Sequence, residues 1–261
     1  MKKLIALLLA LVMVVGLVAC GNKEEAAPAE TLPLPAETEA ATEAATEEAT
    51  EAATEAAPEV TVMTHADYVA ADLDSEVVIE TYVQGHQSWW DNKITVYCQS
   101  PDGAYFLYEL ACSEEDAAKL VPGTKIRVTG YKGEWAGEVE VMDGTFEFVE
   151  GGDTFVAEAL DVTELLASEE LIAHQNEFVS FKGMTVEAIE YKNGEPGDDI
   201  YLTLGKDGAS YNFCVEIYLT GADSDVYTTV GELAEGDVVD VEGYLYWYEG
   251  MNPHITNITK I

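Results

Sequence analysis

The side chains that most often perform chemistry occur in this 261-residue chain, but their spacing forms no catalytic motif. The four histidines, His65, His86, His174 and His254, are far apart in the sequence. No GxSxG, HExxH, P-loop or dinucleotide-binding pattern is present. We therefore expect no enzymatic activity and no cofactor. The alternative is an accessory subunit or a hydrolase-like enzyme without a recognisable catalytic motif.

Cysteines and acidic loops are the remaining candidates for thiol chemistry or metal binding. Cys98, Cys112 and Cys214 are odd in number and irregular in spacing, so we expect buried free thiols rather than a disulfide or a zinc site. The loops Asp72-Leu73-Asp74 and Asp223-Ser224-Asp225 could bind calcium weakly. They lack the ligand spacing and central glycine of an EF-hand, so solvated loops are the preferred interpretation.

The N-terminus has the composition of an export signal. Met1-Lys2-Lys3 is basic, and the apolar stretch 4–18 is shorter than the roughly 20 residues that span a bilayer. The stretch ends in Leu17-Val18-Ala19-Cys20, which resembles the lipobox of bacterial lipoproteins. The resemblance implies a signal peptide at 1–19, lipidation of Cys20 and a Gram-positive type of surface protein on the extracellular face of the membrane. The alternative is ordinary cleavage nearby, which leaves Cys20 free.

Residues 20–60 have the composition of a disordered tether. Residues 21–60 contain eleven Glu and one Lys, and a Thr-Glu pair recurs every four residues from Thr38 to Glu55. A helix would place these glutamates on one face, where like charges destabilise it. Because little apolar surface is available for burial, we expect an extended, self-repelling spacer. O-glycosylation of its threonines is the alternative role.

The rest of the chain is also strongly acidic. Of the formal charge of −38, residues 61–261 carry −30, because Lys2 and Lys3 add two positive charges and residues 21–60 carry −10. Such a charge opposes association with phosphate backbones and anionic lipid headgroups. We therefore expect nucleic acid to be a disfavoured partner, and cationic partners, divalent metal ions and neutral ligands to remain open.

Short strands separated by turns dominate the pattern after residue 76. Turn signals at Pro101-Asp102-Gly103 and Lys206-Asp207-Gly208 each separate two alternating segments. The predicted strands are 76–84, 93–99, 104–111, 125–131, 138–142 with 145–149, 177–190, 199–204, 210–219 and 236–244. Helices are predicted at 113–120, 158–173 and 223–234. The body of the chain is thus expected to be mainly β.

An internal repeat organises these strands into two modules. The segment Gly123-Thr-Lys-Ile-Arg-Val-Thr-Gly-Tyr131 matches Gly236-Asp-Val-Val-Asp-Val-Glu-Gly-Tyr244 at an offset of 113. Each module has three strands, a helix and two strands, and resembles the OB-fold, a five-stranded Greek-key barrel. We therefore predict tandem OB-fold-like barrels at 61–152 and 153–261, each with a short helix. A generic β-sandwich is the alternative fold.

Aromatic side chains gather where OB-folds bind ligands, namely the face of the second and third strands and the loops joining strands 1–2 and 4–5. Tyr244, Tyr246 and Tyr248 are expected on one face of the late strand, following Asp240 and Glu242. Packing between the modules is the alternative role for these tyrosines, and the preferred one. The candidate binding residues are Trp89, Trp90, Trp135, Tyr191, Tyr244, Tyr246, Trp247 and Tyr248.

These observations predict a binding function rather than a reaction. The expected molecule is a non-catalytic module, held at the membrane by its lipid anchor, that binds a cell-wall glycan, a peptide or a surface protein. Fold alone does not name the ligand, because one fold supports many activities.

Overall fold

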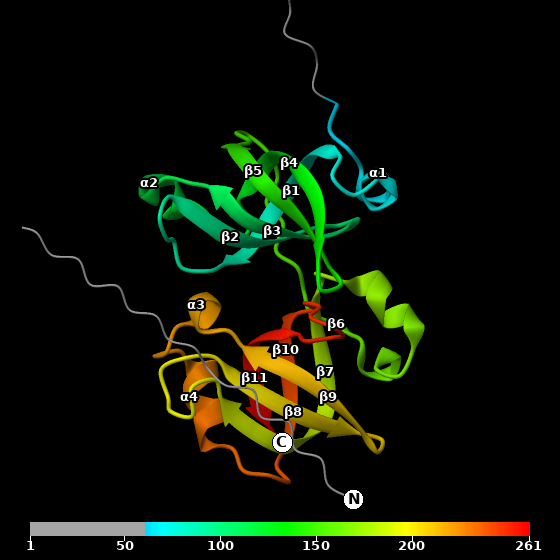
Figure 1. Ribbon diagram of the computed structural model, residues 1–261, viewed down its shortest axis with the longest axis vertical. Helices are drawn as coiled ribbons and strands as arrows, with labels where there is room; N and C mark the ends of the chain where they lie inside the picture. The colour runs from blue at the N-terminus through cyan, green and yellow to red at the C-terminus, as the bar shows by residue number, and fades with distance from the viewer. Residues whose placement is uncertain (1–60) are drawn as a thin grey trace, which may run out of the picture. The chain divides into compact units, whose positions relative to one another are not determined.

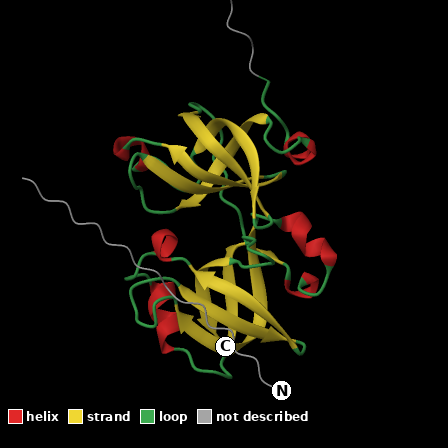
Figure 2. Cartoon of the chain, in the orientation of Figure 1, coloured by secondary structure: helices red, strands yellow, loops and turns green. Residues whose placement is uncertain are grey.

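A computed structural model describes residues 61–261, which are mainly β-structure (Figures 1 and 2). The predicted signal peptide, the lipidation site Cys20 and the tether lie outside these residues. None of the helices within 61–261 has the length and apolar character needed to cross a membrane.

The first half of the described chain is a closed five-stranded barrel. Its strand order is β1-β2-β3-β5-β4, with antiparallel pairs except for the parallel pair β3–β5. Its elements are α1 (His65–Ala70), β1 (Glu76–His86), β2 (Lys93–Ser100), β3 (Gly103–Ala111), α2 (Glu114–Ala117), β4 (Lys125–Trp135) and β5 (Glu138–Phe148). The order of strands and helix, and the closure, confirm the predicted OB-fold-like architecture.

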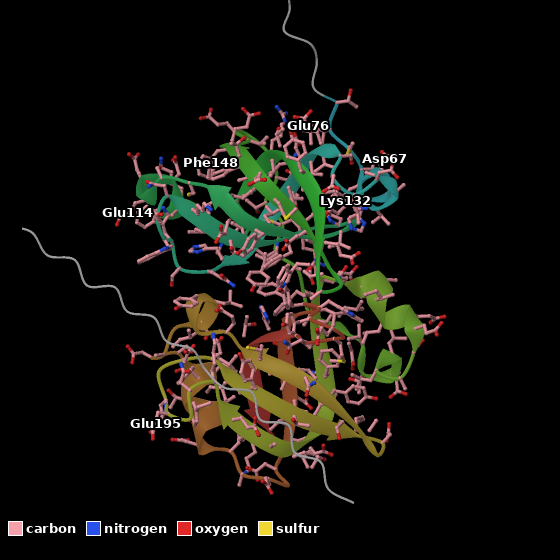
Figure 3. The ribbon with its side chains drawn as sticks, in the orientation of Figure 1. Asp67, Glu76, Glu114, Lys132, Phe148 and Glu195 are labelled. Atoms are coloured by element: carbon pink, nitrogen blue, oxygen red, sulfur yellow. The ribbon has the colours of Figure 1, made fainter. Side chains whose placement is uncertain are left out.

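Alternation of side chains builds the core of this barrel. In β1, Val77, Ile79, Thr81 and Val83 are fully buried, whereas Val78, Glu80 and Tyr82 between them are more exposed. Ser113 caps α2 by accepting a hydrogen bond from the backbone N–H of Asp116. Lys132 of β4 donates from Nζ to the carbonyls of Val69 and Ala71 at the end of α1 (Figure 3), which fixes that helix to the barrel.

The second half repeats this architecture. Its sheet has the order β10-β11-β9-β8-β7-β6, and β10 also pairs with β7, so that β7 to β11 close on themselves. The strands are β6 (Leu160–Asp161), β7 (Phe178–Tyr191), β8 (Ile200–Lys206), β9 (Ala209–Val215), β10 (Val238–Tyr244) and β11 (His254–Lys260). The helices are η1 (Thr163–Leu165), η2 (Glu169–His174), α3 (Ile217–Thr220) and α4 (Asp225–Glu232).

The glycines of the internal repeat have the same structural role in both barrels. Gly123 and Gly236 both have φ of +90°, and each donates from its N–H at 2.8 Å to a carbonyl of the barrel's first long strand. Gly130 and Gly243 lie at register shifts where the following strand passes closely. A Cβ at Gly130 would lie 2.9 Å from the Met142 carbonyl oxygen, and one at Gly243 would collide with the His254 carbonyl. Close approach of neighbouring backbone therefore explains the repeated motif.

Three predicted elements differ from the structure. The helix expected at 158–173 is replaced by β6 and two 3-10 helices, because the Asp161 side chain accepts from both the N–H and the hydroxyl of Thr163 and competes with helical bonding. The strand expected at 210–219 ends at Val215, since Glu216 caps α3 by accepting from the Leu219 N–H. The two strands expected after residue 138 are a single strand, β5, with a bulge.

The two barrels lie in one compact unit and touch through side chains and backbone. Tyr97, Phe106 and Tyr244 form a small buried cluster separate from the two barrel cores. The Trp247 N–H donates to Glu138 at 2.8 Å, and the Phe178 N–H donates to Gln99 at 2.8 Å. The boundary at 152/153 stays a prediction, although it falls in the segment between β5 and β6.

Candidate functional site

The hairpins β2–β3 and β8–β9 occupy the same place in the two barrels. Counted from their turns, the fourth residue pair is Tyr97–Phe106 in β2–β3 and Thr203–Asn212 in β8–β9. In each hairpin the third and fifth pairs contribute side chains to the barrel core. Because side chains alternate along a strand, the fourth pair points outward in both barrels. This outward face is the usual ligand-binding face of an OB-fold.

In the first barrel the outward face is covered. Tyr97 stacks on Tyr244 with 4.5 Å between ring centroids, and Phe106 meets Tyr246 edge-on at 5.1 Å. Tyr97 and Phe106 are 1% and 3% exposed. The surface that would bind a ligand in this barrel is therefore used to pack the second barrel.

In the second barrel the outward face is open and forms a groove of about 660 Å³. Its floor is the β8–β9 surface, and its wall is the loop between β10 and β11. This volume lies within the range of small-molecule and oligomer sites. Among the side chains that line the groove are Tyr201, Thr203, Asn212, Tyr246, Tyr248 and His254.

His254 lies at the floor of the groove with a defined protonation state. It is 7% exposed, and burial lowers the pKa of its imidazole to about 4, so the ring is neutral at pH 7. Its Nδ1 is 2.6 Å from the Tyr97 hydroxyl, which also accepts a hydrogen bond from Gln87 Nε2. The Tyr97 proton is therefore donated to Nδ1, and the tautomer assigned from this network carries its proton on Nε2. The Tyr246 ring stacks on His254 with centroids 4.2 Å apart.

Two buried carboxyl groups support the side of the groove next to α3. Asp199 accepts from Lys192 Nζ at 2.8 Å and from the Ile217 N–H at 3.0 Å. Glu216 accepts from the Leu219 N–H, and burial, with the nearby Asp199 charge, raises the pKa of its carboxyl to about 7. These partners hold both carboxyl groups in place.

The pairing of Cys214 with His254 across β9 and β11 does not form a nucleophile. Cys214 is 3% exposed, and burial raises the pKa of its thiol well above the usual range. The imidazole that lies nearby already accepts the Tyr97 proton on Nδ1. A thiol kept protonated is inert, because the thiolate is the reactive form. All three cysteines within 61–261 are buried and free, as predicted.

The structure brings two of the predicted binding residues into this groove. Tyr246 is half-buried beneath it, and Tyr248 is 51% exposed at its wall. Tyr244 was expected beside them on a solvent face, but it is 6% exposed in the contact between the barrels. The alternation fails because β10 ends at Tyr244, just after the register shift at Gly243. Interdomain packing, the preferred alternative, is thus correct for Tyr244.

The other predicted aromatic residues lie outside the groove. Tyr191 and Trp247 are half-buried against the second core, and Trp135 is 62% exposed where β4 ends. Trp89 packs on the first core and donates from Nε1 to the Cys112 carbonyl at 2.9 Å. Trp90 is 80% exposed and, with Trp89 and Tyr218, lines a smaller pocket of about 390 Å³.

Sequence reasoning missed the polar part of the groove, namely Thr203, Asn212, Asn252 and His254. Counting register from the Lys206-Asp207-Gly208 turn would have placed Thr203 and Asn212 on the outward face. The proximity of His254 to the β8–β9 face depends on the parallel pairing of β11 with β9, which no local sequence pattern indicates.

Weak calcium binding by the two acidic loops stays a prediction. In the part of the chain that the structure describes, no group of three or more His, Cys, Asp or Glu side chains is arranged to hold a metal ion. Asp225 instead begins α4, whose cap is Ser224.

Comparison with known proteins identifies no family for this chain. No family model matches the sequence, and no curated protein is significantly similar to it. Among solved structures, the p204 HINb domain is 13% identical with a TM-score of 0.34, and covers 73% of this chain and 100% of its own. A murine DNA-binding protein bound to double-stranded DNA is 12% identical with a TM-score of 0.35, covering 70% and 95%. A replication protein A heterotrimer bound to single-stranded DNA is 12% identical with a TM-score of 0.30, covering 71% and 48%.

These comparisons correct one prediction. Nucleic acid was expected to be a disfavoured partner because of the acidic charge, yet the solved structures that this chain matches include complexes with DNA. The prediction is wrong as a general exclusion, since net charge averages over a whole surface whereas binding depends on one local face. Nucleic acid is accordingly kept among the ligands to be tested.

Proposed function

We propose that this chain is a lipid-anchored binding protein of the bacterial cell surface, whose ligand site is the groove on β8–β9. The observation that carries the proposal is the open outward face of the second barrel, where the equivalent face of the first is covered. The ligand is a cell-wall glycan, a peptide or a surface protein.

The states of Cys214 and His254 in the groove support binding rather than nucleophilic catalysis. Cys214 is held as a thiol, and His254 donates toward the groove instead of acting as a free base. Side chains such as Asn212 and Tyr248 are able to contact a ligand directly, since both are exposed at the groove. An accessory role beside a surface enzyme is compatible with the same groove.

The surface location is supported by the Leu17-Val18-Ala19-Cys20 pattern and the acidic segment that follows it. Two acyl chains on Cys20 would anchor the chain stably, at about 0.8 kcal/mol per buried CH₂. Cys20→Ser should abolish palmitate labelling and maturation, whereas globomycin, an inhibitor of lipoprotein signal peptidase, should block cleavage of the signal peptide and leave a labelled precursor. Unchanged labelling of Cys20→Ser, or unchanged maturation with globomycin, would contradict the anchor.

The ligand site is tested by calorimetric titration with a mixed panel. The panel contains soluble wall fragments, peptides, and single- and double-stranded oligonucleotides. At least one member should bind the full-length chain, and Tyr248→Ala should weaken that binding about tenfold. Tyr131→Ala is the matched control, because Tyr131 is similarly exposed (45% against 51%) but lies on β4 of the first barrel. Equal effects of the two variants would contradict the proposed site.

A further inference from the structure

We propose that the β8–β9 groove binds a neutral carbohydrate chain. The inference rests on the proposed function and names the class of ligand. The hydrogen-bonding groups that face the groove, its aromatic surface and the charge of its lining support a carbohydrate ligand.

The groove presents donors and acceptors together. His254 Nε2–H is a donor, because Tyr97 fills Nδ1 and no hydrogen bond to Nε2 is found among the described residues. Asn212 and Asn252 each offer an amide donor and acceptor, and Thr203 a hydroxyl. None of these three side chains hydrogen-bonds to another residue within 61–261, so all are available to a ligand. Sugar hydroxyls donate and accept at once, and match such a mixed set.

Aromatic surface lies beside these polar groups. Tyr248 is 51% exposed at the wall of the groove, and Tyr246 is held rigidly by its stacking on His254. A half-exposed tyrosine provides a flat apolar face with a polar edge at low entropic cost. The C–H face of a sugar ring fits such a face, while its hydroxyl edge reaches the amides.

The charge of the lining opposes an acidic sugar. Glu190, Asp199, Glu216 and Glu249 line the groove, and its described lining includes no Lys or Arg side chain. The carboxyl groups accept from hydroxyl donors, as amides do, but an acidic sugar would bring a further negative charge among them. Lys192, the nearest cation to Asp199, is already engaged by it.

The position of the groove also favours a sugar over an extended peptide as the ligand. A peptide that adds to a sheet binds along an open strand edge through its main chain. Here β8 pairs with β7 on one side and with β9 on the other, and the groove lies on the face of these strands. Recognition therefore occurs through side chains, which suits a ring more than a strand.

The test is a calorimetric comparison of four tetramers of different charge against the full-length chain. The chain is held in a detergent without a sugar headgroup. The probes are chitotetraose and cellotetraose, which are neutral, tetragalacturonate, which is anionic, and tetralysine, which is cationic. A neutral tetramer should bind, and Asn212→Ala and Tyr248→Ala should each weaken it about tenfold, the loss of one good contact. Tyr131→Ala should leave the affinity unchanged.

The outcomes separate the ligand class from the site. Binding of tetralysine, tetragalacturonate or an oligonucleotide in place of the neutral tetramers, with the same dependence on Tyr248, would overturn the carbohydrate assignment and leave the proposed site standing. Insensitivity of every ligand to Asn212→Ala and Tyr248→Ala would overturn both.

The assignment of His254 Nε2 as a hydrogen-bond donor can be tested separately by NMR. ¹⁵N chemical shifts of the His254 ring should show a protonated Nε2 and an unprotonated Nδ1 at pH 7, and the Nε2 resonance should move when a neutral tetramer is added. The opposite tautomer would remove the donor on which the match to a sugar acceptor depends.

Discussion

The hairpins β2–β3 and β8–β9 are built alike but serve opposite purposes. Both carry their core side chains at the third and fifth pairs from the turn, and in both the fourth pair points away from the barrel core. In β2–β3 that pair is Tyr97–Phe106, and it is buried against the second barrel. In β8–β9 it is Thr203–Asn212, and it faces the groove.

The difference shows how a duplicated barrel can divide its tasks. The core alternation and the glycines at close backbone contacts recur in both copies, because they specify the barrel. The outward pair is free of that constraint. Two aromatic residues convert one face into an interdomain contact, whereas a hydroxyl and an amide leave the other available for a ligand.

Truncation of the outward pair should have the largest effect on stability where the face is covered. Phe106→Ala removes a ring that is 3% exposed, so the free energy of unfolding should fall by about 3–5 kcal/mol. Asn212→Ala, at the equivalent position of β9, should change it by less than about 0.5 kcal/mol. Denaturant titration of both variants measures the contrast, and similar losses would break the comparison.

The contact between the two barrels should also be sensitive to pH through Glu138. This carboxyl is fully buried and accepts the Trp247 N–H of the other barrel, and burial raises its pKa to about 8. Its native-state pKa therefore lies above the unfolded value near 4.3, and the folded chain holds the proton between these pH values. The contribution is largest in acid and is lost as the pH rises toward 8, by an amount on the order of 5 kcal/mol.

Glu138→Gln isolates this contribution. The amide oxygen can still accept from Trp247, but the side chain no longer titrates. Thermal unfolding between pH 5 and pH 8 should then decline less steeply than in the wild type. The carboxyl groups of Glu140 and Glu216, whose pKa values burial raises to about 7, leave a smaller slope of the same sign. A variant with the full wild-type slope would contradict the role of Glu138.

The repeated glycine should matter equally in both barrels. Gly130→Ala places a methyl group against the Met142 carbonyl, and Gly243→Ala places one against the His254 carbonyl. Each should reduce the free energy of unfolding by about 1–3 kcal/mol, the usual cost of overpacking. Gly152→Ala, where an added methyl would meet only the end of the Lys125 side chain, should stay within about 0.5 kcal/mol in chemical denaturation. A loss in one barrel alone would show that the repeat is not structurally equivalent.

Local sequence signals were sufficient for the fold. Alternation in β1, the Asp102-Gly103 and Asp207-Gly208 turns, and the repeated glycine motif identified two barrels and placed most strands within a few residues. The errors occurred where side chains bond to nearby backbone. Asp161 and Glu216 start short helical turns in segments whose apolar pattern favours a longer helix or strand.

The candidate site was only partly predictable, because it depends on contacts distant in sequence. The aromatic loops drew attention to Tyr246 and Tyr248, which do lie at the groove. The state of His254 depends on Tyr97, 157 residues earlier, and on the packing of one barrel against the other. No sequence pattern within either repeat indicates which of the two outward faces is covered.

The central claim, that the second hairpin face binds and the first does not, is tested most directly by amide chemical-shift mapping during titration with chitotetraose. The amide resonances of Tyr201, Thr203, Asn212 and Tyr248 should shift, and those of Tyr97 and Phe106 should stay unchanged. Shifts centred on the β2–β3 face, or on the Trp89–Trp90 pocket with the β8–β9 groove silent, would contradict it.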